Sequence, residues 1–408
     1  MNNSYFNFTP RELLIIAVAG MGYFVDIYDL LIFSSERVES LQAIGVTANN
    51  MKHVVLMLQN YQMAGLIIGG FLFGVLADKF GRVRVLFASI LLYSIANIAN
   101  AFVTDVPAFA LARLVAGFGL AAELGIALSW ISESLGRSQR TMATMIVSAT
   151  GLCGGITAAI VSSKFHWQTS YIAGGVMGLL LLIFRISINE SKLFNQVKNE
   201  DVKRGSLVHL FGNKSQITKF ILCVLSGAPA FVFMSIYITL APEFSSAFNL
   251  PEKVSVSNAI LVYLIAFTVS DVLCGFLSKV LEKRKIPLLI YAIIQALAVS
   301  FFLLIPPDNA ADFYLRCIFL GFSVGYWGIL ITNSLEQFGT NVRATVATTA
   351  SNLIRGITIP ASVIFMLIAK EHGLIIGGMI VGFSLITISM VSIIFLKDRF
   401  ENDLNFIE

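Results

Sequence analysis

Long apolar runs separated by short polar breaks fill the chain. A helix needs roughly 20 mostly apolar residues to cross the hydrocarbon core of a bilayer, and the sequence contains about twelve runs of that length. We expect these membrane-spanning helices near residues 12–34, 53–77, 85–104, 107–132, 141–163, 168–188, 217–241, 253–279, 286–305, 311–335, 343–369 and 373–397. No small-residue cleavage site follows the first run, which predicts a retained helix and not a removable signal peptide.

Composition supports the same class of protein. Hydrophobic residues make up 57% of the chain, charged residues only 13%, and the mean hydropathy is +0.82. These values are far from those of a soluble globular protein. The four cysteines fall inside predicted spans, where a disulfide framework or a zinc site is not expected. We therefore expect packing cysteines, no metal and no cofactor.

Basic residues predict the orientation in the membrane, because Lys and Arg accumulate in cytoplasmic loops. If the amino terminus is inside, only a few of them lie outside, namely Arg37, Lys52, Lys164, Lys253 and Lys370. This asymmetry predicts two cytoplasmic termini in a plasma membrane, such as a bacterial inner membrane. It also explains the net charge of +4 without a nucleic acid partner. We expect a monomer whose surroundings are the lipid bilayer.

The longest polar interval separates six predicted helices from six. It predicts an N-terminal bundle over residues 1–188, a cytoplasmic linker over 189–216 and a C-terminal bundle over 217–408. Three charged residues recur in register across the two halves, which indicates a duplication. They are Arg113, Glu133 and Arg140 in the first half, and Arg316, Glu336 and Arg343 in the second.

The polar stretch "GVLADKFGRVR" joins the second and third predicted helices. Gly74 permits a close approach of two helices, and Gly81 permits a tight turn. Asp78 can face the amino end of a neighbouring helix or Arg140. With Arg82, these residues predict a gate or scaffold. The matching stretch of the second half has a lysine where the aspartate would be, so we expect the inner clasp to be stronger in the first half.

The same stretch resembles the loop signature of the major facilitator superfamily, and the topology, the linker and the repeated charges agree with that family. The resemblance implies an all-α membrane protein of twelve helices in two pseudo-symmetric six-helix bundles. Its first, fourth, seventh and tenth helices would surround a central cavity. The first-helix stretch "GMGYFVDIYDLLIF" further resembles the proton-coupled phosphate and metabolite symporters. The fourth-helix stretch "AAELGIA" departs from the phosphate pattern.

Two acids interrupt the first predicted helix. At ~1.5 Å per residue, Asp26 and Asp29 lie about 20 to 27 Å from its cytoplasmic start, and Arg113 lies about 10 Å from the outer start of the fourth helix. These depths coincide. A charge at mid-membrane depth needs a partner, water or a function, so we predict proton coupling, with a structural ion pair as the alternative. Glu123 is the next candidate proton site, or a structural glutamate.

The second half offers cations instead of acids. Arg355 lies about 18 Å along its helix, near the membrane centre, where it could bind a carboxylate or phosphate with two hydrogen bonds. It could instead pair with Asp271. Pro360, one turn later, predicts a bend. The other candidate substrate contacts are Arg316, Tyr28, Asn60, Gln62, Tyr326 and Trp327.

Three classes of function remain. We favour a proton-driven importer of a small organic anion such as a carboxylate, because central arginines accompany the first-helix acids. An exporter of amphipathic compounds or of a carboxylate siderophore, and a phosphate or sugar-phosphate transporter, are alternatives. A receptor or intramembrane enzyme is disfavoured, since no catalytic constellation accompanies the duplicated cavity. The sequence has no phosphate-binding loop and no nucleophile elbow, so we do not expect energy from nucleotide hydrolysis.

Overall fold

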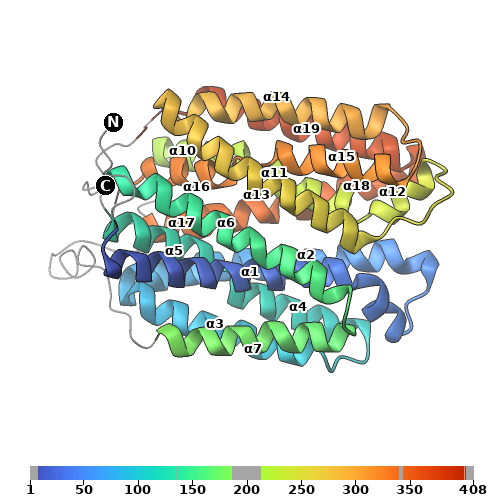
Figure 1. Ribbon diagram of the computed structural model, residues 1–408, viewed down its shortest axis with the longest axis horizontal. Coiled ribbons are helices and arrows are strands. Elements are labelled where there is room, and N and C mark those ends of the chain that lie inside the picture. The colour runs from blue at the N-terminus through green and yellow to red at the C-terminus, as the bar shows by residue number, and fades with distance from the viewer. Residues whose placement is uncertain (1–7, 136, 186–212, 340–342, 399, 401–408) are drawn as a thin grey trace.

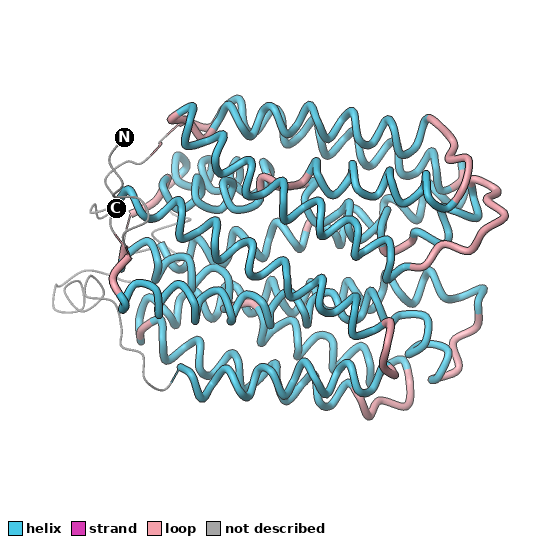
Figure 2. The backbone as a smooth tube through the Cα atoms, in the orientation of Figure 1, coloured by secondary structure: helices cyan, strands magenta, loops and turns pink. Residues whose placement is uncertain are grey.

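The computed structural model describes residues 8–135, 137–185, 213–339, 343–398 and 400, and these residues form helices and no strand. Twelve of the helical stretches in the described part are long and apolar enough to cross a membrane, as the sequence predicts. Figure 2 shows the loops gathered at the two ends of the molecule, with a few interruptions inside its body. Most of the predicted linker lies outside the described residues.

The first half begins at a well-formed helix cap, because the Thr9 side chain accepts from the Glu12 backbone and Glu12 reaches back to Thr9. The first two helices are longer than predicted, since their polar outer ends stay helical. The helices of this half are α1 (Pro10–Ala43), α2 (Ala48–Phe80), α3 (Arg82–Asn100), α4 (Val106–Leu120), α5 (Glu123–Ser134), α6 (Arg137–Ser162) and α7 (Trp167–Arg185).

The second half has more interruptions. It comprises α10 (Lys214–Ser226), α11 (Pro229–Phe233), the π-helix η2 (Met234–Ile238), α12 (Ala241–Ala247), α13 (Val256–Leu281), α14 (Lys285–Leu304), α15 (Ala310–Ser323), α16 (Trp327–Glu336), α17 (Arg343–Gly356), α18 (Thr358–His372) and α19 (Leu374–Phe395).

Several spans break near their middle, including the spans formed by α4 and α5, by α15 and α16, and by α17 and α18. The break between α17 and α18 falls where Pro360 predicts a bend. Proline has no backbone N–H, so the carbonyl of Gly356 cannot receive the usual helical bond from residue 360. Broken helices are tolerated in a membrane where they are buried in protein, which is where these breaks occur.

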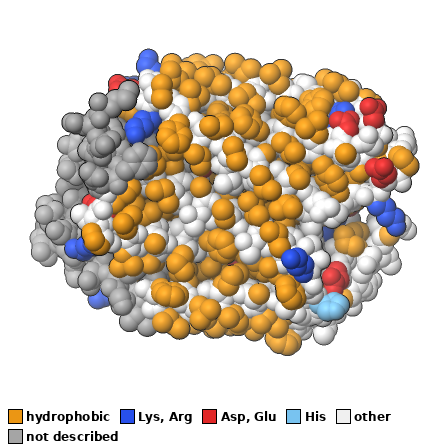
Figure 3. Space-filling view, viewed as in Figure 1, with side chains coloured by type: hydrophobic (Ala, Val, Ile, Leu, Met, Phe, Trp, Pro, Cys, Tyr) orange, Lys and Arg blue, Asp and Glu red, His pale blue; other side chains and the backbone are white. Residues whose placement is uncertain are grey.

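The two halves lie against each other along several helices. In Figure 1 most first-half helices occupy the lower part of the view and most second-half helices the upper part, with α6 and α17 at the level where the halves meet. The main contacts between halves are α2 with α17, α6 with α13, and α5 with α17. Glycine permits the last of these, because a Cβ on Gly125 would lie 2.3 Å from the Thr348 Cα. Hydrophobic side chains cover most of the visible face between its ends, as a membrane belt would require (Figure 3).

Close helix packing within the first half can be tested at Gly117. A Cβ on Gly117 would lie 2.1 Å from the backbone oxygen of Gln62, so Gly117→Ala forces α4 away from α2. Overpacking of this kind costs about 1–3 kcal/mol, and we expect a lower thermal unfolding midpoint of the purified protein. Gly20→Ala is the control, because its Cβ would meet only the Thr150 side chain, at 3.3 Å. Equal midpoints for the two variants would contradict the packing described.

Candidate functional site

An ion pair joins the two halves at the centre of the molecule. The Arg355 Nη2 of α17 donates to the Asp26 Oδ2 of α1 at 3.0 Å. The side chains are 1% and 0% exposed, so both charges are removed from solvent and lipid. An isolated charge buried in this way would cost several kcal/mol, and here each charge is neutralised by the opposite charge of its partner.

This pair corrects two expectations for Arg355. The arginine is neither uncompensated nor paired with Asp271. The Asp271 Oδ1 accepts from the backbone N of Gly328 at 2.9 Å, and its Oδ2 accepts from the Ser148 hydroxyl. Sequence reasoning missed the Asp26 pairing because the two residues are 329 positions apart. The Ser148 contact runs from α6 to α13, so Asp271 also links the two halves.

A second buried guanidinium lies in the first half. Arg113 is fully buried, and its Nη2 donates to the Gln62 Oε1 of α2. Its Nε and Nη1 have no hydrogen-bond partner among the described residues. The rings of Phe33 and Tyr171 have their centroids 5.2 and 5.9 Å from its Cζ. The site therefore combines two unoccupied hydrogen-bond donors with aromatic walls.

Asp29 lies one helical turn beyond Asp26 on α1 and near Arg113. Neither of its carboxylate oxygens has a hydrogen-bond partner within the described part of the chain. Arg113 acts on it electrostatically without a direct hydrogen bond, and Asn97 lies beside it. A Cβ on Gly174 would lie 2.4 Å from its Oδ1, so α7 closes over it. Two acids and two arginines thus meet at one depth.

A small cavity of about 20 Å³ lies beside this group, between α1, α2 and the seventh span, which consists of α10, α11 and η2. It is lined partly by the polar side chains of Ser34, Gln59, Gln62 and Thr239. This volume holds about one water molecule. It is too small for an organic molecule.

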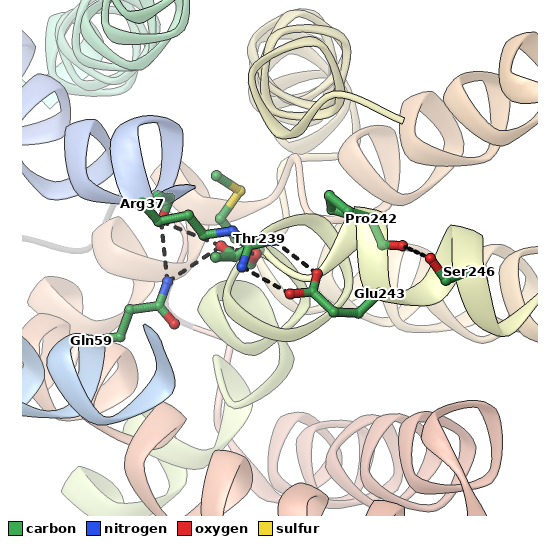
Figure 4. A network of polar contacts seen from close by, with 8 residues as sticks. Arg37, Gln59, Thr239, Pro242, Glu243 and Ser246 are labelled. Atoms are coloured by element: carbon green, nitrogen blue, oxygen red, sulfur yellow. Dashed lines mark hydrogen bonds and ion pairs between the residues drawn. The ribbon is translucent and has the colours of Figure 1, made fainter. Parts of the chain in front are cut away.

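The end of the molecule away from residue 10 is closed by polar contacts between the halves. Arg37 of α1 donates from both Nη atoms to the carboxylate of Glu243 of α12, at 2.9 and 2.8 Å. Gln59 of α2 donates to Ser34 and Thr239 at 3.1 and 3.3 Å. Figure 4 shows Arg37 and Gln59 reaching from the first half toward Thr239 and Glu243.

The opposite end is closed at the predicted loop signature. The Asp78 Oδ2 accepts from the backbone N and the Oγ1 of Thr345, at 2.9 and 2.6 Å. Asp78 thus lies at the amino end of α17, one of its two expected positions, and it also pairs with Arg82 at 3.2 Å. Gly81 has a φ of 111°, which suits the predicted turn. The Cβ position of Gly74 lies 3.0 Å from the Thr345 Cα, a close approach as expected.

Arg316 does not face this central group. It donates to the backbone carbonyls of Phe301, Ile305 and Pro306, and its Nη2 pairs with Asp312 at 2.7 Å. These bonds fasten the end of α14 to α15, so the Arg316 side chain, an expected substrate contact, is directed away from the central group in this structure. Arg316 lies near the start of α15, close to the last carbonyls of α14, which have no partner within their own helix. These carbonyls explain why the side chain bonds there and not at the centre.

The aromatic and amide candidates divide between the centre and the periphery. The Trp327 Nε1 donates to the Tyr23 hydroxyl at 2.9 Å, a further contact between halves. The Tyr28 hydroxyl donates to the Ser170 carbonyl at 2.9 Å and so fastens α1 to α7. Tyr326 and Glu123 are buried, and Asn60 accepts from Ser362 at 3.0 Å.

Glu336 pairs with a residue that sequence reasoning missed. The Arg284 Nη2 and Nε donate to its carboxylate at 2.8 and 3.1 Å. The Arg140 Nε donates to the Leu135 carbonyl at 3.3 Å. The side chains of Glu133 and Arg343 lie outside the described ones. The described residues contain no group of three or more His, Cys, Asp or Glu that could hold a metal ion.

Arg37, Glu243 and Gln59 were also missed as site residues. The available signal was weak: Arg37 is one of the few basic residues at the outer side, and Glu243 follows a helix of the other half. Only the fold shows that they meet. A search for opposite charges just beyond the outer ends of the first and seventh predicted spans could have found the pair.

The fold and the site define a multi-pass membrane transporter with charges enclosed between two helical halves. The chain belongs to the Major Facilitator Superfamily, whose sequence profile matches residues 14–363. It is 26% identical over 352 residues to a putative niacin/nicotinamide transporter of Bacillus subtilis, covering 83% of each chain. It is also 26% identical over 400 residues to a cis,cis-muconate transport protein of Acinetobacter baylyi, covering 93% of each.

Solved structures confirm the expected fold. A partially occluded inward-open conformation of the xylose transporter from E. coli superposes with a TM-score of 0.72 at 18% identity, covering 96% of this chain and 99% of that one. The relatives described here are transporters and not enzymes, in agreement with the sequence-based expectation.

The central ion pair can be tested by a double-variant cycle. Removing one partner of a buried pair leaves an uncompensated charge and costs about 3 kcal/mol or more, whereas removing both is often close to neutral. We expect Asp26→Ala and Arg355→Ala each to lower the thermal unfolding midpoint of the purified protein, and the double variant to recover most of the loss.

The control cycle combines Asp271→Ala with Arg355→Ala. Asp271 has other partners, so this combination should lower the unfolding midpoint additively. Recovery in the control cycle and none in the Asp26 cycle would show that Arg355 pairs with Asp271 and contradict the structure.

Proposed function

We propose that the protein is a proton-coupled symporter that imports a small organic acid across a plasma membrane by alternating access, with both termini in the cytoplasm. The observation that carries this proposal is the Asp26–Arg355 ion pair between the halves, with Asp29 and Arg113 one helical turn away. Residues 10–185 and 214–395 would be the two moving bundles, joined by the predicted linker.

Arg113 is the proposed first contact for the substrate. A guanidinium binds a carboxylate with two parallel hydrogen bonds, from Nη2 together with either Nε or Nη1. In Arg113 the Nε and Nη1 atoms lack partners within the described structure, and Nη2 donates to Gln62. Phe33 and Tyr171 could contact a planar ring or conjugated chain attached to that carboxylate. The names of the relatives support this substrate class, because niacin and muconate are unsaturated carboxylates.

Arg355 would complete the site from the other half. It can bind a substrate carboxylate only if it gives up Asp26, and an ionised Asp26 left alone in this buried place would be costly. A proton on Asp26 removes that cost. Asp29 is buried without hydrogen bonds, so an arriving anion at Arg113 also favours a proton there. Substrate and proton therefore bind together, and either acid could carry the proton.

The two closures explain how access would alternate. Opening toward one side requires breaking the Arg37–Glu243 pair, and opening toward the other requires Asp78 to leave the amino end of α17. Each closure joins opposite halves, so rocking the halves can break one while keeping the other. An inward proton gradient would then drive substrate import.

Substrate recognition by arginine predicts a preference for the carboxylate over its amide. In proteoliposomes containing the purified protein, we expect counterflow of labelled niacin and much less of nicotinamide, its uncharged analogue. Arg113→Lys keeps the charge but loses the planar fork, so half-maximal exchange should require roughly tenfold more niacin, about one hydrogen bond's worth of binding.

Arg316→Lys is the matched control, because Arg316 lies away from the centre and its substitution should leave the concentration dependence of exchange unchanged. Equal counterflow of niacin and nicotinamide would contradict carboxylate recognition. Absence of any organic-anion counterflow, across a panel that includes muconate, would contradict the substrate class.

Proton coupling predicts a separation of accumulation from exchange. Asp26→Asn and Asp29→Asn mimic the protonated acids, so the variant at the coupling acid should lose pH-driven accumulation of substrate yet retain counterflow at equal pH. Asp308→Asn, at an exposed loop residue, should behave as the parent. Undiminished accumulation in both single variants and in the double variant would exclude these acids.

A further inference from the structure

A lateral groove lies between α2 and α18, away from the central site. Its volume is about 650 Å³, within the size range of ligand sites. Tyr61, Val363 and Leu367 line it and are 44%, 50% and 65% exposed. Because these side chains belong to membrane spans, their exposed surface faces hydrocarbon. The groove therefore opens sideways into the bilayer.

The length of the groove matches one leaflet. Its lining runs from Lys52 to Ala64 on α2 and from Ile359 to Lys370 on α18, which at 1.5 Å per residue is about 17–18 Å on each helix. Half of a hydrocarbon core of roughly 30 Å is about 15 Å. In Figure 1 the start of α2 and the end of α18 lie at the right-hand end of the molecule, opposite the start of α1.

The floor of the groove is closed. The Ser362 hydroxyl donates to the Asn60 Oδ1 at 3.0 Å, so these two side chains are bonded to each other across the groove. Beyond it, α2 packs tightly on α17, where a Cβ on Gly70 would lie 2.9 Å from the Asn352 amide nitrogen. The contact between α2 and α17 thus closes the inner end of the groove between α2 and α18, and leaves a space of one leaflet's depth toward the outer end.

The mouth of the groove carries positive charge. Lys52 and Lys370 line it from opposite helices, and no acidic residue lines it. Neither lysine forms an ion pair within 4.0 Å among the described residues. A single lysine at a membrane boundary usually just extends to water. Two lysines, one from each half, that flank an apolar groove are complementary to an anion with a hydrocarbon tail.

We propose that this groove binds an acidic phospholipid of the leaflet opposite the termini. The phosphate contacts Lys52 and Lys370, and an acyl chain lies along the apolar lining down to Asn60. Because α2 and α18 belong to different halves, the bound lipid wedges them apart at their outer ends. This inference goes beyond the proposed function and does not rest on it.

The test is native mass spectrometry of the full chain in detergent, titrated with dioleoyl-phosphatidylglycerol or dioleoyl-phosphatidylcholine. The two lipids share acyl chains and differ in net headgroup charge. We expect tighter binding of phosphatidylglycerol. The double variant Lys52→Ala, Lys370→Ala should weaken its binding roughly twenty- to thirtyfold, since each basic residue near a membrane surface contributes about fivefold. Lys253→Ala, at an exposed loop lysine of the same side, should have no effect.

A second variant tests the groove itself. Ala64→Phe fills its inner part and should reduce the binding of both lipids, whereas Leu72→Phe, two turns along α2 and outside the lining, should not. Equal affinity for the two lipids, or unchanged phosphatidylglycerol binding in the lysine variant, would overturn the proposal. Displacement of phosphatidylglycerol by niacin would also overturn it, because the groove would then admit substrate.

Discussion

The cost of placing charge in hydrocarbon governs this structure. Asp26, Arg355, Arg113 and Asp29 all lie at mid-membrane depth, where a lipid-facing charge would cost several kcal/mol. Asp26 and Arg355 pair with each other between the two halves, and Asp29 and Arg113 lie near each other inside the first half. The interface between the halves is therefore polar at its centre. Other interior positions are packed with hydrophobic side chains, and hydrophobic side chains also cover much of the outer face seen in Figure 3.

The same constraint explains where the helices break. The interruption between Gly356 and Thr358 follows directly after Arg355, and the one after Ser323 lies next to Trp327, whose indole bonds to α1. A break in a membrane helix leaves backbone groups that lipid cannot satisfy. The centre of the protein offers polar partners and so permits the irregular backbone that places these side chains toward the interface.

The fold was predictable from sequence to a large extent, because a membrane helix depends on local composition. Twelve spans, the close approach at Gly74 and the turn at Gly81 all follow from residues near one another in the chain. The pairings were not predictable. Depth along a helix places Asp26, Asp271 and Arg355 at similar levels, but the rotation of α17 about its axis decides which acid the arginine meets, and that rotation depends on packing at positions such as Gly125.

In the mechanism we propose, one arginine, Arg355, holds either an acid or a substrate and so links chemistry to movement. While Asp26 is ionised, its attraction to Arg355 holds the halves together at their centre. Arg355 is the one cation bonded to Asp26 among the described residues. In the proposed cycle, a proton on Asp26 removes that attraction, and a substrate anion takes the place of Asp26 at Arg355. An empty, unprotonated protein and a protein loaded with both substrate and proton then have balanced centres, whereas a protein with only one of them has an unpaired buried charge. The free-energy cost of that unpaired charge disfavours transport of the proton without the substrate, or of the substrate without the proton. This is the physical requirement for coupling.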